Sequence, residues 1–374
     1  MKVLVTGSDG FIGKNLVAHL RERSRFEVLP FTRACTERDL GALVGRADFV
    51  FHLAGVNRPV NPAEFDAGNA GLTRELVGHI ARQGRAIPVV FASSAQAERD
   101  NPYGLSKRAA ENALLAHRNA TASPVYIYRL ANVFGKWCRP NYNSVVATFC
   151  HNIARDFPIT VHDPAASVSL VYIDDVVEEF TRVLERNQAG DRPAPSGPFR
   201  DVGPVHATTV GELAARIRVF KESRATLTTD RVGTGFLRAL YSTYVSYLPP
   251  ESFAYPILRH VDPRGEFAEV LRTPDCGQFS YFTAHPGVTR GAHYHHSKTE
   301  KFLVIRGRAK FRFRHLATGE TAEIESSGDA PRIVESIPGW AHDITNVGDT
   351  EMIVMLWANE VFDRGRPDTY ACKV

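Results

Sequence analysis

A set of metal-binding residue types near the C-terminus constrains the fold of this chain most strongly. His293 and His295 are separated by one residue, so on a strand both imidazoles point to the same face. Glu300 and His342 can complete the set, because imidazole and carboxylate groups together hold divalent metal ions. The C-terminal part is therefore expected to fold so that several strands bring these four side chains to one place.

The sequence around these residues has the pattern of an all-β domain. From about Ile257 onward, short apolar strands alternate with turns, and no segment has a convincing helical pattern. Many short strands of this kind predict a barrel or jelly roll. The strands are expected at Gln278–Thr283, Phe302–Ile305, Lys310–His315, Thr321–Ile324 and Met352–Trp357.

Residues 1–180 have a different pattern, in which apolar strands alternate with amphipathic helices. This alternation predicts a parallel, doubly wound α/β sheet. The aromatic stretch Tyr241–Tyr255 is expected to be a connector between the two patterns. We therefore expect an α/β domain over residues 1–245 and an all-β domain over residues 250–374. Strands of the sheet are expected at Val3–Val5, Phe26–Phe31, Phe49–Leu53, Val89–Ala92 and Val125–Arg129, and helices near Lys14–Arg21, Leu72–Arg82, Lys107–Leu115 and Thr209–Lys221.

The turn after the first strand predicts a dinucleotide site. Three glycines stand between this strand and the first helix, so the turn is tight and its backbone can approach a pyrophosphate at a helix N-terminus. A glycine-rich turn without a ligand is the alternative. Candidate cofactor-binding residues in this turn and after the third strand are Gly7, Ser8, Gly10, Phe11, Ile12, Gly13, Leu53, Ala54 and Gly55.

Arg33 indicates which dinucleotide is used. The second strand ends in Phe31, Thr32 and Arg33, without the Asp or Glu that would bind the ribose 2′-hydroxyl of NAD. An arginine suits the 2′-phosphate of NADP, so NADPH is the expected cofactor. The alternative is a solvated surface arginine.

Tyr103 and Lys107 form the candidate catalytic pair. They are four residues apart and share one face of a helix. Lys107 is expected to lower the pKa of Tyr103 and to hold the nicotinamide ribose, while Tyr103 gives a proton to a carbonyl. Ser94 would hydrogen-bond the same carbonyl oxygen, and the adjacent Ser93 is the second choice.

Composition excludes several function classes. The 374 residues carry a net charge of only +4, which argues against nucleic-acid binding and suits an anionic small molecule.

The cysteines and the N-terminus indicate where the protein works. The five cysteines are scattered without a C-x-x-C pair, which favours reduced thiols in a cytoplasm. The N-terminus runs directly into a first strand that is too short for a signal peptide, and no apolar run reaches membrane-spanning length. We therefore expect a cytoplasmic protein without a membrane partner.

Four further segments agree with the glycine turn: Phe91–Ser94, Asn101–Lys107, Arg129–Gly135 and Val171–Val176. With the G-x-x-G-x-x-G spacing they make residues 1 to about 240 similar to the extended short-chain dehydrogenases/reductases that act on nucleotide sugars. The resemblance implies a Rossmann fold, and it implies that Asn132 lies near the nucleotide diphosphate of the substrate. The alternative for Asn132 is a turn-forming residue at the end of a strand.

The C-terminal motif has the spacing G-x5-H-x-H-x4-E-x6-G from Gly287 to Gly307, and Gly339, His342 and Asn346 follow a second pattern. These patterns resemble the two signatures of cupins, although Pro338 stands one position away from its usual place. The resemblance implies a metal site formed by His293, His295, Glu300 and His342. Zinc is the expected ion, since such ligands hold it without redox demands, but they also suit iron, manganese or nickel. A histidine-lined pocket without an ion remains the alternative.

The segment Asp262–Glu269 is similar to a stretch of the cupin-type 4-keto-6-deoxysugar 3,5-epimerases. Epimerisation beside a ketone requires a stabilised enolate and a base that removes and returns the proton. The sequence leaves this base open among His296, Glu266, Lys301 and Tyr294.

Over its whole length, including Gly135–Ser144, the chain resembles capsular polysaccharide enzymes that join an extended short-chain reductase to a metal cupin. The resemblance implies C3 epimerisation of a UDP-2-acetamido-2,6-dideoxy-4-hexulose by the cupin. NADPH-dependent C4 reduction would then give UDP-2-acetamido-2,6-dideoxy-L-talose, within UDP-N-acetyl-L-fucosamine synthesis for a capsule or O-antigen. The resemblance also implies a homodimer.

Two other function classes remain open. One is a nucleotide-sugar 4-epimerase or dehydratase with a structural cupin, against which the separate cupin and Arg33 argue. The other is a non-enzymatic redox sensor, against which the set Ser94, Tyr103 and Lys107 argues.

Overall fold

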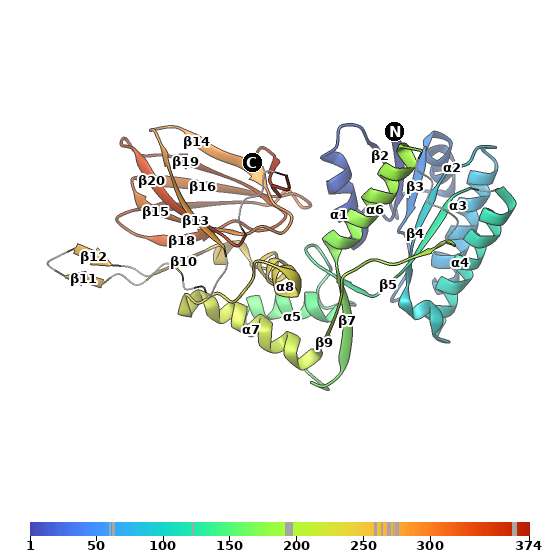
Figure 1. Cartoon of the computed structure of the whole chain (residues 1–374), viewed down its shortest axis with the longest axis horizontal. Helices are drawn as coiled ribbons and strands as arrows, with labels where there is room; N and C mark the ends of the chain where they lie inside the picture. Colours follow the sequence, from blue (N-terminus) through green and yellow to red (C-terminus); the bar gives the residue numbers. More distant parts are fainter. Residues whose placement is uncertain are drawn as a thin grey trace. The chain divides into compact units, whose positions relative to one another are not determined.

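The computed structural model describes the chain except residues 60, 62–63, 122, 191–196, 258–259, 263–264, 268–270, 272, 274–276 and 361–364. It divides into two compact units that are interleaved along the sequence (Figure 1). The sheet unit comprises Met1–Val133 and Ser169–Ala207, and the barrel unit comprises Phe134–Val168 and Thr208–Val374. The domain ranges 1–245 and 250–374 describe expected functions and stay a prediction.

The sheet unit contains the predicted parallel sheet. Six strands run in the order β2-β1-β3-β4-β5-β8, and every neighbouring pair is parallel. The central strands are buried on both faces, as expected when helices cover both sides of a sheet. The strands are β1 (Lys2–Thr6), β2 (Glu27–Phe31), β3 (Phe49–His52), β4 (Val89–Ser94), β5 (Val125–Leu130) and β8 (Phe199–Arg200).

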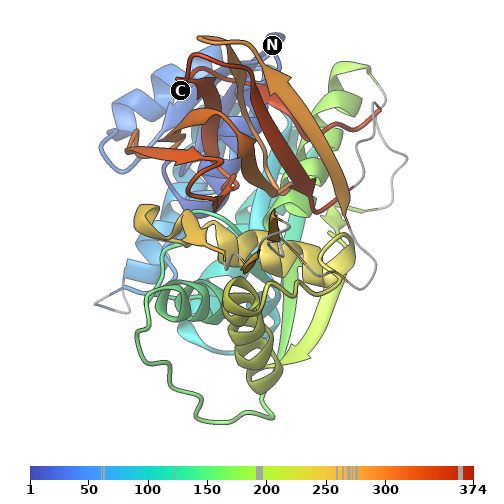
Figure 2. The same ribbon diagram turned by 90° about the vertical axis from the view of Figure 1, so that its left-hand side faces the viewer.

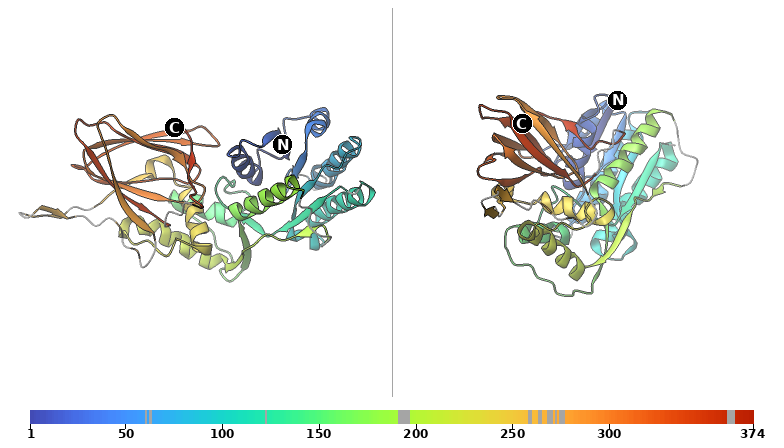
Figure 3. Two further views of the ribbon diagram at one scale, coloured as in Figure 1. Left: turned by 45° about the horizontal axis from the view of Figure 1, so that its top comes forward. Right: turned by 60° about the vertical axis from the view of Figure 1, so that its left-hand side comes forward.

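Helices lie on both faces of this sheet (Figures 1 and 3). Helices α1 (Phe11–Arg21) and α6 (Ile173–Gln188) cover one face. Helices α2 (Glu37–Arg46), α3 (Leu72–Ala81) and α4 (Pro102–Thr121) cover the other, where their apolar residues share one core with β1, β3 and β4. The short helices η1 (Asp66–Gly71) and η2 (Ala95–Glu98) complete the unit. The chain order reverses between β1 and β3, and ligands of doubly wound sheets bind at the carboxyl ends of such strands.

The barrel unit contains the predicted all-β structure. Two five-stranded antiparallel sheets have the orders β10-β18-β15-β20-β13 and β17-β16-β19-β14-β21, and β11 and β12 form a hairpin. The strands are β10 (Ala254–Pro256), β11 (His260–Asp262), β12 (Gly265–Phe267), β13 (Gln278–Ala284), β14 (Thr289–Tyr294), β15 (Glu300–Arg306), β16 (Arg308–His315), β17 (Thr321–Ser327), β18 (Arg332–Glu335), β19 (Trp340–Asn346), β20 (Met352–Ala358) and β21 (Tyr370–Ala371).

Three helices precede these strands and lie at one side of them (Figures 1 and 2). They are α5 (Val145–Ala154), α7 (Val210–Thr226) and α8 (Gly235–Val245), followed by η3 (Pro250–Ser252). Helix α7 begins with the expected capping box of Thr209 and Glu212. Strands β6 (Asn132–Phe134), β7 (Ser167–Tyr172) and β9 (Val205–Thr209) pair where the chain passes between the units.

The prediction of a connector at Tyr241–Tyr255 is wrong for its first part, because α8 continues to Val245. All residues from Ala239 to Val245 are buried, so this helix lacks the polar face that gives a surface helix its periodic pattern. No helix in the described part of the chain has both the length and the apolar character needed to cross a membrane.

Candidate active site and metal centre

The glycine turn after β1 has the tight geometry that its sequence predicts. Gly7 has φ of +67°, and its N–H donates to the carbonyl of Phe31 at 2.8 Å. A Cβ at Gly7 would lie 2.8 Å from the backbone of Ala54, and one at Gly13 would lie 2.1 Å from the Gly7 carbonyl oxygen. Only glycine fits at both positions, so the turn brings the N-terminus of α1 beside the segment after β3.

A chain of buried hydrogen bonds positions the Leu53–Gly55 segment. The Thr73 hydroxyl donates to the carbonyl of Asn69 at 2.8 Å, so it accepts from Nε2 of His52, 2.9 Å away. Nδ1 of His52 then accepts from the Thr6 hydroxyl at 2.8 Å. Oγ1 of Thr6 in turn accepts from the backbone N–H groups of Leu53 and Ala54, each at 3.2 Å. Burial and a nearby lysine lower the pKa of His52 to about 3, which keeps the ring neutral.

The other candidate cofactor-binding residues surround this turn. Ser8 is buried, with its hydroxyl 3.4 Å from the carbonyl oxygen of Phe31, and Phe11 and Ile12 begin α1. Arg33 is exposed just beyond the end of β2. Asn69, which the sequence analysis did not single out, accepts from the Val56 N–H at 2.8 Å and donates to the Ser106 hydroxyl at 2.9 Å.

Ser94, Tyr103 and Lys107 are brought together where β4 ends and α4 begins. Nζ of Lys107 donates to the carbonyl of Ala92 at 2.7 Å and lies 4.3 Å from the centre of the Phe91 ring. Burial lowers the pKa of Lys107 to about 8, although the charge of Glu111 opposes this shift. Lys107 therefore reaches the carboxyl end of the sheet as a buried amine next to Gly55, where a Cβ would lie 3.8 Å from its Nζ.

The pKa of Tyr103 is raised by burial, and a hydrogen bond with the Ser94 side chain only partly opposes this. The expectation that Lys107 lowers the pKa of Tyr103 is therefore wrong for this structure, because Lys107 donates to the Ala92 carbonyl and burial dominates. Ser94 is the serine beside Tyr103, whereas the second choice, Ser93, donates to Glu111 at 2.5 Å.

The buried Glu111 forms an ion pair with Arg129, whose side chain is 31% exposed. Arg129 binds both carboxylate oxygens of Glu111, at 3.0 and 2.7 Å, and also donates to Glu98 at 2.9 Å. The sequence analysis missed this pair, although Glu111 is one helical turn after Lys107. That four-residue spacing signals only that Glu111 lies near Lys107, whereas its pairing with Arg129 of β5, 18 residues away, depends on tertiary folding.

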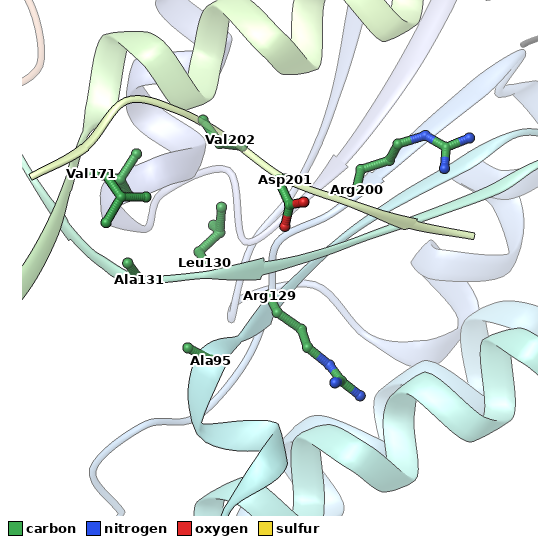
Figure 4. A pocket seen from close by; sticks show the side chains of 9 residues that line it. Ala95, Arg129, Leu130, Ala131, Val171, Arg200, Asp201 and Val202 are labelled. Atoms are coloured by element: carbon green, nitrogen blue, oxygen red, sulfur yellow. The ribbon is translucent and has the colours of Figure 1, made fainter. Parts of the chain in front are cut away.

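A small cavity of about 190 Å³ lies in the same unit, and Ala95, the residue after Ser94, is part of its lining (Figure 4). The side chains of Arg129 and Arg200 extend away from Val171 and Ala131, so backbone and apolar groups form much of the lining. Asn132 follows Ala131 and donates to the carbonyl of Ser169 at 3.1 Å. The cavity is lined by Ala95, Arg129, Leu130, Ala131, Val171, Arg200, Asp201, Val202 and Val205.

The four predicted metal ligands form one group inside the barrel unit. One donor atom from each of His293, His295, Glu300 and His342 lies within 4.8 Å of the others. His293 and His342 are register partners on β14 and β19, and their ring centres are 4.8 Å apart. His293 is half-buried and the other three are buried, so the group opens on the side of His293.

The donor geometry fits a divalent ion. Nε2 of His295 and Nε2 of His342 lie 3.0 and 3.4 Å from one oxygen of Glu300. Two donors that each lie about 2.1 Å from one ion are separated by about 3.0 Å at a right angle and about 3.4 Å at a tetrahedral angle. Burial and the neighbouring imidazoles lower the pKa of His293 to about 3, so this ligand is neutral and can bind a metal.

Burial alone would raise the pKa of Glu300, but His295 and His342 hold it well below its usual range, so the carboxylate is ionised.

The turn before His342 is built around Gly339, which has φ of +83° and donates to the carbonyl of His295 at 3.0 Å. A Cβ at Gly339 would lie 2.9 Å from the Trp137 ring. The turn before His342 is thus well formed despite the displaced Pro338. Asn346 is a structural residue that donates to the carbonyls of Ala284 and Thr350 at 3.0 and 2.9 Å.

The candidate epimerase bases have different surroundings. Lys301 is buried and pairs with Glu335. Tyr294 and His296 are buried and pack against the Tyr370 ring. The Glu266 side chain and half of the segment Asp262–Glu269 (residues 263–264 and 268–269) lie outside the described residues.

The sheet unit thus has the predicted doubly wound α/β fold with Ser94, Tyr103 and Lys107 close together, and the barrel unit holds the four predicted metal-binding residues as one group. Residues 3–195 match the model of the NAD dependent epimerase/dehydratase family, and residues 260–370 match the polysaccharide biosynthesis C-terminal domain. The chain belongs to the NAD dependent epimerase/dehydratase family, and this membership implies a nicotinamide cofactor.

Three known proteins are similar to this chain, two of them over its whole length. It is 58% identical to a UDP-2-acetamido-2,6-beta-L-arabino-hexul-4-ose reductase of Pseudomonas aeruginosa, over 100% of this chain and 99% of that one. The crystal structure of the capsular polysaccharide assembling protein CapF from Staphylococcus aureus matches over 100% of both chains, with 41% identity and a TM-score of 0.68. A UDP-glucuronic acid 4-epimerase from Bacillus cereus shares only the fold, at 19% identity and a TM-score of 0.52, over 60% of this chain and 83% of that one. The resemblance to capsular polysaccharide enzymes is confirmed.

Proposed function

We propose that this chain is a bifunctional nucleotide-sugar enzyme of polysaccharide biosynthesis. The barrel unit epimerises C3 of a UDP-2-acetamido-2,6-dideoxy-4-hexulose, and the sheet unit reduces the C4 ketone with NADPH to give UDP-2-acetamido-2,6-dideoxy-L-talose. One observation carries the proposal: the chain holds two complete sets of reactive side chains, Ser94, Tyr103 and Lys107 in one unit and the four metal-binding residues in the other. The enzyme is expected to be a cytoplasmic homodimer.

In the sheet unit, the bound nicotinamide would supply the hydride for reduction. Tyr103 gives its phenolic proton to the oxygen of the C4 ketone, and Ser94, already hydrogen-bonded to Tyr103, orients the same oxygen. The ammonium of Lys107, four residues along α4 from Tyr103, would hold the nicotinamide ribose. The buried Glu111 accepts from Ser93 and from Arg129, and these contacts would help to position this end of β4 and α4.

The cavity next to Ser94 supports binding of the sugar nucleotide in the same unit. Its first lining residue, Ala95, directly follows Ser94, and its lining continues along Leu130 and Ala131 to the carboxyl end of β5. Asn132 stands at this end and would lie near the diphosphate. The UDP group in the name of the Pseudomonas aeruginosa relative supports the substrate class.

The choice of NADPH rests on Arg33, which is exposed beyond β2 with no carboxylate in the Phe31–Arg33 stretch. A guanidinium can bind the 2′-phosphate, which NADH lacks.

In the barrel unit, His293, His295, Glu300 and His342 would hold a divalent ion, with zinc as the first choice. The ion would supply Lewis-acid stabilisation of negative charge on a substrate oxygen. Three of these side chains are buried and His293 is half-buried, so the site is open to solvent on the side of His293.

The test is incubation of the purified full chain with the 4-keto UDP-sugar and NADPH. We expect one NADPH oxidised for each ketone consumed, and a product with inverted C3 and a hydroxyl at C4. Exchange between C4 epimers without net NADPH oxidation would contradict the proposal and favour the 4-epimerase alternative. No reaction with any 4-keto UDP-sugar would favour the sensor.

A further inference from the structure

The C-terminal segment Gly365–Cys372 runs beside the predicted metal ligands, although it is 23 residues beyond the last of them, His342. Its strand β21 pairs with β14, with Ala371 opposite His293. The N–H of Cys372 donates to the carbonyl of Ala292 at 2.8 Å. The segment therefore forms the edge of the sheet that carries the first histidine.

Asp368 makes the closest contacts between this segment and the metal ligands. Its backbone carbonyl lies 2.6 Å from Nδ1 of His295. A carbonyl can only accept, so Nδ1 carries a proton, and Nε2 is the nitrogen that faces Glu300, 3.0 Å away, where it would bind the metal ion. The second ring nitrogen of a metal-binding histidine is commonly fixed in this way, which sets both tautomer and ring orientation.

The carboxylate of Asp368 holds the loop that follows His295. One oxygen accepts from the N–H of His296 at 2.9 Å. The other accepts from the N–H and the hydroxyl of Ser297, at 2.9 and 3.0 Å, and from the N–H of Lys298 at 2.7 Å. Three successive backbone N–H groups thus converge on one side chain, immediately before the ligand Glu300.

Residues on both sides of Asp368 strengthen the same contact. Nζ of Lys298 donates to the Thr369 hydroxyl at 2.7 Å, and the carbonyl of Pro367 lies 3.4 Å from the same Nζ. From the other direction, helix α8 reaches the loop through Ser242, whose hydroxyl donates to the carbonyl of Ser297. The loop between His295 and Glu300 is therefore fixed by two elements distant in sequence.

We propose that Asp368 is a positioning residue for the metal centre: its carbonyl orients His295, and its carboxylate fixes the loop His296–Lys298 so that Glu300 meets the histidines. This inference rests on the metal site of the proposed function. It adds a residue outside both histidine motifs, on a segment that no part of those motifs predicts.

The chain allows two informative substitutions at this position. Asp368 has φ of +37°, in the left-handed region that asparagine and glycine tolerate. Asp368→Asn removes the charge and replaces one acceptor oxygen with a donor, while Asp368→Gly removes the side chain and relieves the backbone. Both keep the carbonyl that accepts from His295. Asp349→Asn, at an exposed position between β19 and β20, is the matched control.

The first measurement is zinc affinity of the purified full chain, by competition with a chromophoric chelator. Loss of an outer group that holds a metal site in place typically weakens metal binding about 10- to 100-fold, and the group lost here is the carboxylate that fixes the loop before Glu300. We expect a loss of this size in both Asp368→Asn and Asp368→Gly and none in Asp349→Asn. Parental zinc affinity in both Asp368 variants would overturn the proposal. If the parent chain itself binds no zinc, the metal part of the proposed function fails instead.

The second measurement does not need a metal. Amide hydrogen exchange in the metal-free protein should accelerate at His296–Lys298 in both Asp368 variants, while the β16–β17 hairpin keeps its protection. Unchanged exchange at His296–Lys298 would show that the carboxylate does not hold the loop. Equal acceleration throughout the barrel strands would also overturn the proposal, because Asp368 would then support the whole domain rather than this site.

Discussion

At the scale of single residues, Lys107 has the surroundings that most affect catalysis. It is buried between the Ala92 carbonyl and the Phe91 ring, and its pKa is lowered to about 8 by burial. The groups that face it are the neutral His52 on β3 and the charged Glu111 on its own helix. Because a lowered lysine pKa leaves the ammonium intact only below that pH, the charge is lost in the mildly alkaline range.

We therefore expect ketone reduction to decline as the pH rises through about 8, since the ammonium of Lys107 disappears there. The measurement is the rate of NADPH oxidation at saturating substrate across the pH range. Glu111→Gln should move the alkaline decline to lower pH, because the Glu111 carboxylate raises the pKa of Lys107. A decline at the same pH in the parent and in Glu111→Gln would contradict this assignment.

Tyr103→Phe keeps the ring but removes the proton donor. The rate of C4 reduction should fall by about 10²-fold or more, the usual size of a lost general acid. NADPH binding, measured by fluorescence titration, should be nearly unchanged. Tyr128→Phe is the control, because the Tyr128 hydroxyl donates to Glu179 on α6 and takes no part in the proposed chemistry. A Tyr103→Phe variant that reduces the ketone at the parental rate would reject the role.

Arg33→Ala tests the choice of cofactor. The variant should lose NADPH affinity by a much larger factor than NADH affinity, because only NADPH carries the 2′-phosphate. Dissociation constants for both cofactors, measured side by side, give the comparison. Arg38→Ala, which removes an exposed arginine from α2, should change neither affinity. Equal losses for the two cofactors in Arg33→Ala would show that the guanidinium does not bind the phosphate.

At the scale of elements, a buried ion network joins α7 to the strands of the barrel unit. Glu335 on β18 pairs with Arg224 of α7 through one oxygen and with Lys301 of β15 through the other. Lys301 also donates to the Tyr255 hydroxyl at 3.1 Å. Although burial opposes it, the two cations lower the pKa of Glu335, so its stabilising charge is present at neutral pH and is lost as the pH falls.

Glu335→Ala leaves two buried cations without their partner, which typically costs about 3–5 kcal/mol of folding free energy. The matched control is Glu325→Ala, because Glu325 pairs with Arg308 on the exposed face at 3.9 Å and should cost less than about 1 kcal/mol. Urea unfolding followed by tryptophan fluorescence reports on this unit, since all three tryptophans lie in it. Similar losses in both variants would mean that the network contributes no more than a surface pair.

The elements that sequence predicted best are those with a strong local pattern. The strands β1 to β5 and the turn at Gly7 follow from apolar runs and glycines, and the strands β13, β15, β16, β17 and β20 follow from short apolar runs between turns. Helix α8 was missed because it is buried on nearly every side and so shows no amphipathic period. Helix α2 was also missed, although Thr36 and Asp39 form a capping box that marks its start.

The candidate site residues also fall into two groups, those that a local spacing in the sequence predicted and those whose contacts depend on the folded structure. Fixed spacing predicted the pair Tyr103 and Lys107, because one helix carries both. Motif spacing also predicted the group around His293, although its members come from the paired strands β14 and β19 and from β15 of the other sheet. Asp368 could not be predicted, since its contacts with His295 depend on tertiary folding of a distant segment. The effect of burial on Tyr103 was likewise invisible in the sequence, because desolvation depends on the packed structure.

At the scale of the whole molecule, the two units alternate along the chain. Residues 134–168 leave the sheet unit to join the barrel unit, and the chain then returns for residues 169–207. The helices α5, α7 and α8 thus belong to the barrel unit, although residues up to about 240 resemble a short-chain reductase. Each unit nevertheless holds its own reactive set, so we expect the two reactions to be separable by mutation.

The separation is tested by proton exchange at C3 of the 4-keto UDP-sugar in heavy water without NADPH. Removal of the metal, or His293→Ala, should abolish deuterium incorporation at C3, because the group that stabilises the enolate is lost. The same protein should still oxidise NADPH when it is given an already epimerised ketone. Tyr103→Phe should show the reverse, with normal deuterium incorporation and little NADPH oxidation.

A thermal melt must accompany these assays, because loss of a bound metal also weakens folding. A His293→Ala variant that melts at the same temperature as the parent and still incorporates deuterium fully would show that epimerisation does not need the metal site. Loss of incorporation in Tyr103→Phe alone would move the epimerase chemistry into the sheet unit. Since the two sets share no residue, a single substitution that stopped both reactions in a folded protein would contradict the division of labour itself.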